Sequence, residues 1–302
     1  MSDDLFDDEQ DILDIDEMLK PKKSEDLNSS ICAMLVGQED SLKSGIAIDC
    51  RSKKQIEDGE VVFVVDLDNA NTPIWKDHWD ASENIRLVNP AVMKSVTQDD
   101  GSEKLEIDYD RTIQRINQFI FKVSEAEKTG SIKLAGFVFD GVDKLLKSSE
   151  YTMRTQKELD IDDGVSYQYW NIRNKLFSDV IFSVKSLKCP KYFITHTKTY
   201  QKKKTDKNGK EKVVKEWEDG IWEKSTLNEM HQVIDTRKEM GIDGVTTYYA
   251  KVREFKGRPE IVGKEFKTMV IDSNDNTHTY YGLPQLRDKE HVEEVDYDQD
   301  LF

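Results

Sequence analysis

Short, almost entirely apolar segments recur along the chain, separated by longer segments of mixed character. Four of them cover residues 31–36, 61–68, 133–143 and 191–197. Such runs lack the alternation of a half-exposed strand and are typical of strands buried on both faces. They predict a buried, mostly parallel sheet.

Segments with apolar residues at helical spacing lie between these runs. They cover residues 44–59, 109–130 and 167–187. Because helices alternate with strands, the expected fold class is α/β, with a mostly parallel central sheet flanked by helices.

The last third of the chain has no alternation of apolar runs and helical segments. Residues 201–224 are polar and basic, and Asn208-Gly209 is a dipeptide favoured in two-residue hairpin turns. Strand-like segments follow at residues 231–236, 246–255 and 266–272. We expect these strands to extend the sheet in an antiparallel manner.

Composition bounds the domain organisation. A chain of 302 residues with 37% hydrophobic residues can bury one substantial core. Its ends are acidic and poor in apolar residues, so we expect a disordered arm over residues 1–28, one domain over 29–287 and an acidic tail over 288–302. The formal net charge of -16 argues against a wholly basic nucleic-acid-binding coat, although local patches decide binding more than the sum does.

The sequence favours a cytoplasmic protein. It has no run of about 18 apolar residues, and its first residues are acidic where a signal peptide is basic. Cys32, Cys50 and Cys189 are widely spaced and include no CxxC pair, which fits neither a disulfide framework nor a thiolate zinc site. We therefore expect no membrane partner and a reducing cytoplasm, that of the host if the protein is phage-encoded.

A candidate phosphate loop follows the first apolar run. Residues 37–44 read G-Q-E-D-S-L-K-S and fit G-x-x-x-x-G-K-[ST] except that Leu42 replaces the second glycine. A lysine at position 43 would reach the β and γ phosphates of ATP, and the Ser44 hydroxyl would bind Mg²⁺. The alternative is an ordinary turn between a strand and a helix.

A second support is Asp140, which closes the segment G-F-V-F-D at residues 136–140 within the third apolar run. An aspartate at this place would hold the magnesium ion through water. The expected ligand-binding set, with Ser44 and Asp140 as the metal-binding members, is Gly37, Ser41, Lys43, Ser44 and Asp140.

The end of the second apolar run carries a family resemblance. Residues 64–73 read V-V-D-L-D-N-A-N-T-P and resemble the RecA family, in which this strand ends in Asp-x-Glu and a proline follows. The resemblance covers about residues 30–272 and implies a RecA-like P-loop NTPase core. It implies that Asp68 takes the place of the glutamate that polarises the attacking water, and that His196 takes the place of a glutamine that senses the γ-phosphate. The alternatives are a solvated carboxylate cluster at a strand end and an ordinary hydrogen-bonded histidine.

The basic segment corresponds to the DNA-contacting loop of RecA-like proteins, which comes directly after the fourth strand. Lysines that track phosphates and rings that stack on bases are what sequence-tolerant binding of single strands requires. The alternative, weighed equally, is a solvated hairpin whose tryptophans pack on the body. The residues concerned are Lys202, Lys203, Lys204, Lys207, Lys210, Lys212, Trp217 and Trp222.

Residues 249–259 are similar to the late strand and basic turn that follow this loop in RecA-like and phage-encoded annealing ATPases. On this resemblance Lys251, Arg253, Lys256 and Arg258 would reach the nucleotide of a neighbouring subunit in a homo-oligomer. The alternative is a solvated edge strand protected by charge.

These expectations converge on an ATP-binding protein that acts with Mg²⁺ on single-stranded DNA in phage-type recombination, annealing or replication, with ATP hydrolysis as its expected activity. Two alternatives share the core: a catalytically weak nucleotide-binding scaffold, and a DNA packaging or helicase-type motor. The acidic tail resembles those of bacterial single-strand-binding proteins, so replication or single-strand-binding proteins are further expected partners; a solubilising tail is the alternative.

Overall fold

The computed structural model describes residues 31–49, 51, 53–67, 84–98, 100–205, 211–275, 277–280 and 283. The predicted arm over residues 1–28 and the predicted tail over 288–302 lie outside these residues.

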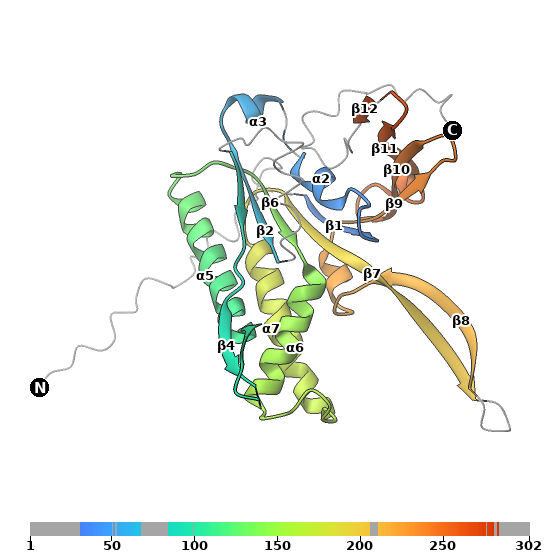
Figure 1. The fold of residues 1–302 in the computed structure, drawn as a ribbon. Helices are drawn as coiled ribbons and strands as arrows, with labels where there is room; N and C mark the ends of the chain where they lie inside the picture. Colours follow the sequence, from blue (N-terminus) through green and yellow to red (C-terminus); the bar gives the residue numbers. More distant parts are fainter. Residues whose placement is uncertain are drawn as a thin grey trace, which may run out of the picture.

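A mixed sheet forms the centre of the described part (Figure 1). The strand order is β12-β11-β10-β9-β1-β7-β6-β2-β3, and β8 pairs with β7 alone. From β9 to β3 neighbouring strands are parallel, whereas β9 to β12 pair antiparallel. The strands are β1 (Cys32–Gly37), β2 (Val61–Asp66), β3 (Ile85–Val88), β6 (Leu134–Asp140), β7 (Lys191–Thr205), β8 (Glu211–Gly220), β9 (Gln232–Met240), β10 (Val245–Phe255), β11 (Glu265–Asp272) and β12 (Thr277–Tyr280).

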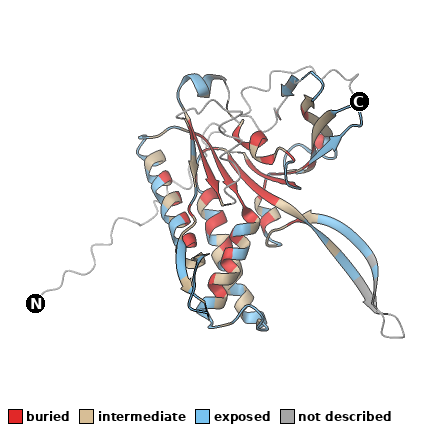
Figure 2. Cartoon of the chain, in the orientation of Figure 1, coloured by how far each residue is buried: buried red, intermediate tan, exposed pale blue. Residues whose placement is uncertain are grey.

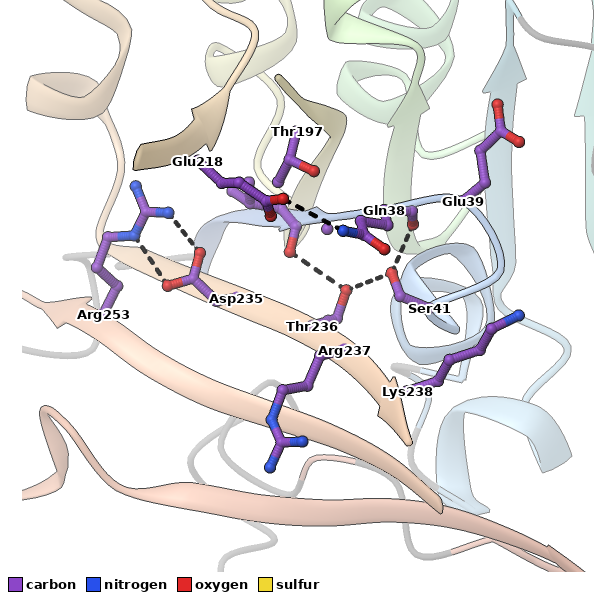
Figure 3. Close-up of a pocket in the computed structure, with 12 residues that line it drawn as sticks. Gln38, Glu39, Ser41, Thr197, Glu218, Asp235, Thr236, Arg237, Lys238 and Arg253 are labelled. Carbon is purple, nitrogen blue, oxygen red and sulfur yellow. Dashed lines mark hydrogen bonds and ion pairs between the residues drawn. The ribbon is translucent and has the colours of Figure 1, made fainter. Parts of the chain in front are cut away.

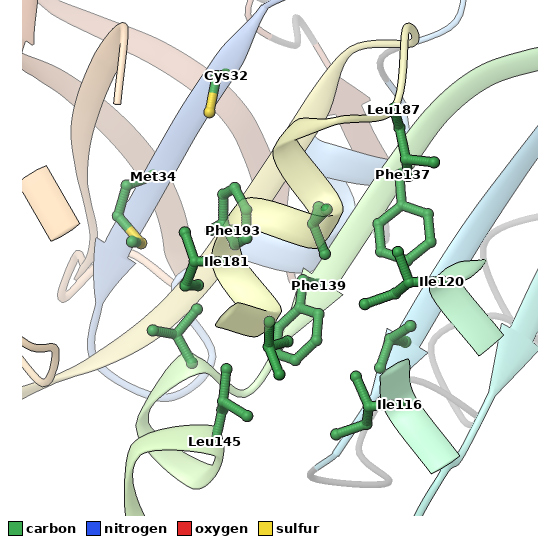
Figure 4. Packing of buried hydrophobic residues seen from close by; sticks show 14 of the residues in the cluster. Cys32, Met34, Ile116, Ile120, Phe137, Phe139, Leu145, Ile181, Leu187 and Phe193 are labelled. Carbon is green, nitrogen blue, oxygen red and sulfur yellow. The ribbon is translucent and has the colours of Figure 1, made fainter. Parts of the chain in front are cut away.

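Both faces of the parallel strands are covered, which explains why these strands read as continuous apolar runs. Met34 points into a core shared with three long helices (Figure 4), and Val36 belongs to the same core. Ala33 and Leu35, on the opposite face, pack with Ile46 and its neighbours in a short helix. The three long helices are α5 (Tyr109–Lys128), α6 (Val142–Gln156) and α7 (Tyr167–Lys185), and the short ones are α2 (Lys43–Ile48) and α3 (Lys53–Glu57). None of the described helices is long and apolar enough to cross a membrane.

Strand β7 has two parts. Its first residues lie in the buried sheet, and the rest leaves the body and pairs only with β8 as a two-stranded arm (Figures 1 and 2). A separate small hairpin, β4 (Met93–Thr97) and β5 (Glu103–Ile107), lies next to the long helices (Figure 1).

The parallel strands place several expected site residues at one edge. Gly37 is in register with His196 between β1 and β7, and Asp66 is in register with Asp140 between β2 and β6. Strand β7 lies between β1 and β6, so the phosphate-loop candidate and Asp140 lie on either side of it. The carboxyl-terminal edge of this sheet is therefore where the candidate chemistry gathers.

The α/β class, the mostly parallel sheet and its antiparallel extension are confirmed, with three corrections. Residues 44–59 form two helices rather than one, because the polar stretch 49–55 offers no apolar face to pack on the sheet. Helix α6, directly after β6, was not predicted. Strand β9 is parallel to β1 rather than antiparallel, because the chain between β8 and β9, including the short 3-10 helix Thr226–Glu229, returns across the sheet first.

Candidate functional site

The loop between β1 and α2 turns through a left-handed residue at position 42, where the phosphate-loop motif has glycine and this chain has leucine. Leu42 has a φ of 66° and a ψ of 13°, in the left-handed region, and Asp40 also has a positive φ of 55°. Leucine rarely adopts this conformation because its Cβ approaches the following carbonyl. The turn is thus built with a strained leucine, whose side chain packs against the core beside α2.

Gly37 is required by close contacts at the start of the loop. A Cβ atom there would lie 2.3 Å from Thr236 Oγ1 and 2.5 Å from Ser41 Oγ. These two hydroxyls are 2.7 Å apart, and Ser41 Oγ also donates to the carbonyl of Gln38 at 2.8 Å. Ser41 is therefore buried inside the loop, and its hydroxyl links the loop to Thr236 of β9 (Figure 3).

Lys43 folds back into the loop. Its side chain is buried, and Nζ donates to the carbonyl of Gln38 at 2.5 Å and to that of Gly37 at 3.2 Å. The loop thus surrounds a positive charge.

Ser44 and Asp140 lie in direct contact, although 96 residues separate them in sequence. Ser44 Oγ donates to Asp140 Oδ2 at 2.5 Å. Asp140 is buried at the end of β6, and the chain turns into α6 at Gly141, whose φ of 102° is unfavourable for other residues. Two oxygen ligands of the type Mg²⁺ prefers are thus together beside Lys43. The described residues hold no group of three or more His, Cys, Asp or Glu side chains placed for a metal.

His196 lies at the same edge, bound to a carboxylate that the sequence did not single out. Its Nδ1 is 3.4 Å from Asp143 Oδ2, in the first turn of α6. Burial alone raises the pKa of Asp143, but the hydrogen bond and charge of His196 outweigh it and leave that pKa below its ordinary value of 3.8. Asp143 lies three residues after Asp140, in the first turn of the helix that follows the strand, and this closeness in sequence was the available signal.

A pocket of about 390 Å³ lies beside the loop, on the β9 side (Figure 3). Arg253 crosses one end of it, donating from Nε to Asp235 Oδ2 at 2.9 Å and from Nη1 to Asp219 Oδ1 at 2.7 Å. Burial alone would lower the pKa of Arg253, but these two hydrogen-bonded carboxylates outweigh it and raise the pKa. Between Arg253 and the phosphate loop, Gln38 Nε2 donates to Glu218 Oε1 at 3.4 Å (Figure 3). The base of the β7–β8 arm is thus joined both to the loop and to β10.

The other expected trans-acting cations lie on or after β10. Lys251 is exposed, and Lys256 Nζ donates to the carbonyl of Asn228 at 2.5 Å. Arg258 pairs with Glu260 at 2.9 Å. Of the four cations, Arg253 alone lines the described pocket, in the same chain as the phosphate loop.

The expected DNA-binding residues separate into two groups. Lys202 and Trp217 are exposed on the arm, and Trp217 stacks on Tyr200 with ring centroids 5.8 Å apart. Trp222 instead packs partly buried against the helix-covered core. Lys207 and Lys210 lie outside the described residues, as does Asp68, and the side chains of Lys203, Lys204 and Lys212 are not described. Tyr200 is a residue that the sequence reasoning missed, although its even spacing from Lys202 was visible.

No protein-family model matches this chain, and no curated protein matches it.

Proposed function

We propose that this chain is a RecA-like P-loop protein that binds ATP with Mg²⁺ at residues 37–44 and acts on single-stranded DNA in recombination, annealing or replication. The observation that carries the proposal is the contact between Ser44 and Asp140. A hydroxyl that follows the loop lysine, bound to a strand-ending carboxylate, is the pair that a magnesium nucleotide site needs.

The residues present fit such a ligand. Mg²⁺ in nucleotide sites is held by one or two carboxylates together with phosphate oxygens and water, rather than by a cage of protein ligands. Ser44 and Asp140 would hold the ion, which neutralises phosphate charge. Lys43 would exchange its two carbonyl partners for phosphate oxygens, because charge-assisted hydrogen bonds are about twice as strong as neutral ones.

Hydrolysis is part of the proposal. Asp68 would orient the attacking water from just beyond β2, which ends beside Asp140. His196 would contact the terminal phosphate, with Asp143 fixing its imidazole. Both roles act mainly in the transition state, so loss of either side chain should lower turnover more than binding.

The test is a calorimetric titration with ATP in the presence of Mg²⁺ and of a chelator. We expect Mg²⁺-dependent binding, about 10- to 100-fold weaker in Lys43→Ala and Ser44→Ala, since each removes a hydrogen bond to a charged group. Ser183→Ala is the matched control, because its hydroxyl bonds the carbonyl of Asp179 on an exposed part of α7. A wild-type chain without affinity for ATP would end the proposal.

A second candidate is a nucleotide-binding scaffold that does not turn over. The observation that favours it is Leu42, which stands where the phosphate-loop motif has glycine and holds a strained left-handed backbone with a bulky side chain beside the nucleotide site. Steady-state ATPase assays with and without single-stranded DNA separate the two: DNA-stimulated turnover supports the ATPase, and tight binding without turnover supports the scaffold.

A further inference from the structure

The β7–β8 arm has two chemically different faces. Residues directly opposite each other in an antiparallel pair project to the same side, and successive residues alternate. Tyr200 opposes Trp217 and Gln201 opposes Glu216, and both pairs are in contact, by ring stacking and by a hydrogen bond of 2.8 Å. The register is therefore fixed by side chains as well as by backbone. One side, the lysine-aromatic face, carries Lys198, Tyr200, Lys202, Lys215, Trp217 and Asp219; the other, the acidic face, carries Thr199, Gln201, Glu216 and Glu218.

The acidic face is turned toward the phosphate loop. Glu218 accepts a hydrogen bond from Gln38 and lines the pocket beside the loop together with Thr197 (Figure 3). The lysine-aromatic face projects from the opposite side of the arm, except at its base, where Asp219 binds the pocket-lining Arg253.

The lysine-aromatic face carries unbalanced positive charge. Lys202 and Lys215 are directly opposite each other, and like charges in this position destabilise a two-stranded ribbon. Among the described side chains of this face Asp219 is the one carboxylate, and it is already bound to Arg253. An anionic ligand along the face would relieve this repulsion.

The rings identify the kind of anion. Trp217 is 40% exposed, with Lys215 Nζ 5.4 Å from its ring centroid. Exposed rings beside lysines suit bases that are free to stack, whereas duplex bases already stack on each other. From Lys198 to Lys202 the strand rises about 13 Å, which is close to four base-to-base steps of about 3.4 Å in a stacked single strand.

We propose that single-stranded nucleic acid binds along the lysine-aromatic face, with bases stacked on the Tyr200–Trp217 pair and phosphates at Lys198, Lys202 and Lys215. This deepens the proposed function and rests on it for the expectation of a single-stranded partner. It adds Lys198, Tyr200 and Lys215 to the binding surface. It leaves out Trp222, which belongs to the core.

The test is a titration of a fluorescent oligothymidine with the full chain at several salt concentrations, followed by anisotropy. Trp217→Leu and Tyr200→Leu should each bind about 5- to 100-fold more weakly, with an unchanged salt slope. Trp217→Phe keeps a ring and should stay close to wild type. Lys202→Gln should reduce the log–log salt slope by about 0.7.

The decisive variant moves one cation to the other face. The double change Gln201→Lys with Lys202→Gln keeps the charge and composition of the arm. On this proposal it binds as weakly as Lys202→Gln alone. If it regains wild-type affinity and slope, only the net charge of the arm matters and the face assignment is overturned.

The same samples separate this inference from the ATP site. DNA binding that depends on the lysine-aromatic face, without affinity for ATP, would leave the inference standing and remove the nucleotide site. ATP binding without oligothymidine binding, or tighter binding of duplex DNA or an acidic peptide, would overturn the inference alone. Thermal melts check folding: the variants of exposed Lys202 and Trp217 should melt close to wild type, and Tyr200→Leu, which replaces a half-buried ring, is interpreted beside its own melt.

Discussion

Leu42 offers a direct test of the loop conformation. At its left-handed backbone, glycine should be more stable than alanine, which is the reverse of the usual order. In most positions alanine is more stabilising than glycine by about 0.5–1 kcal/mol, since glycine loses more chain entropy on folding. At a φ of 66° any side chain with a Cβ carries a cost of about 1–2 kcal/mol. The difference between these terms leaves Leu42→Gly more stable than Leu42→Ala by about 1 kcal/mol.

Comparing glycine with alanine removes the packing of the leucine side chain, which both variants lack. The matched control is Lys122, which is exposed on helix α5. There alanine should be more stable than glycine by about 1 kcal/mol. The free-energy difference between the alanine and glycine variants should therefore have opposite signs at positions 42 and 122, and the two values should lie about 2 kcal/mol apart.

The measurement is urea unfolding of the four variants, followed by circular dichroism and analysed by linear extrapolation. A Leu42→Ala variant that is as stable as Leu42→Gly, or more stable, would refute the left-handed turn. The lysine at position 43 would then lack the loop described around it.

Three further predictions concern the same edge of the sheet. Gly37→Ala should destabilise the chain by about 1–3 kcal/mol in chemical unfolding, because the added methyl group collides with two hydroxyls; Gly164→Ala, where nothing lies within 4 Å, should be neutral. The lowered pKa of Asp143 contributes stability that is present above its unfolded pKa of about 3.9 and lost as the pH falls through the lower folded value. In His196→Ala burial is no longer opposed by the imidazole, so the acid loss that Asp143 contributes in wild type should shrink or reverse, and stability from thermal melts should fall less steeply from neutral to acid pH than in wild type; parallel curves would contradict this. Trp222→Ala should lower the free energy of unfolding by about 2 kcal/mol, as for a half-buried core ring, while oligothymidine affinity stays unchanged; the reverse outcome would return Trp222 to the binding surface.

Much of the fold was accessible from the sequence because burial on both faces leaves an unmistakable pattern. The runs at β1, β2, β6 and β7 were found from their apolar residues alone. Helix α6 was missed because it begins directly after β6, without a loop, and its residues 142–156 are mostly polar. The direction of β9 depends on the path between β8 and β9, which no local pattern records.

The candidate site shows the same division. The contact between Ser44 and Asp140 could be expected, since Asp140 ends one parallel strand, Ser44 lies just after another, and the carboxyl ends of these strands share one edge. The left-handed Leu42 could not, because the residue found there disfavours the conformation that the surrounding fold imposes. The ion pairs of Arg253 depend on β8 and β9 meeting β10, a tertiary arrangement outside any motif.

Strand β7 is continuous from the buried sheet into the arm. The number of residues between the sheet and the arm, odd or even, therefore decides which side of the arm each side chain faces. His196 is locked in register with β1, and Tyr200 lies four residues further on. Inserting or deleting a single residue between them would rotate every later side chain to the other side of the ribbon. Lysines would then face the phosphate loop and glutamates would replace them outside, with no change in composition. A change of length between His196 and Tyr200 should therefore keep Tyr200 and Lys202 on their present face only when it adds or removes two residues.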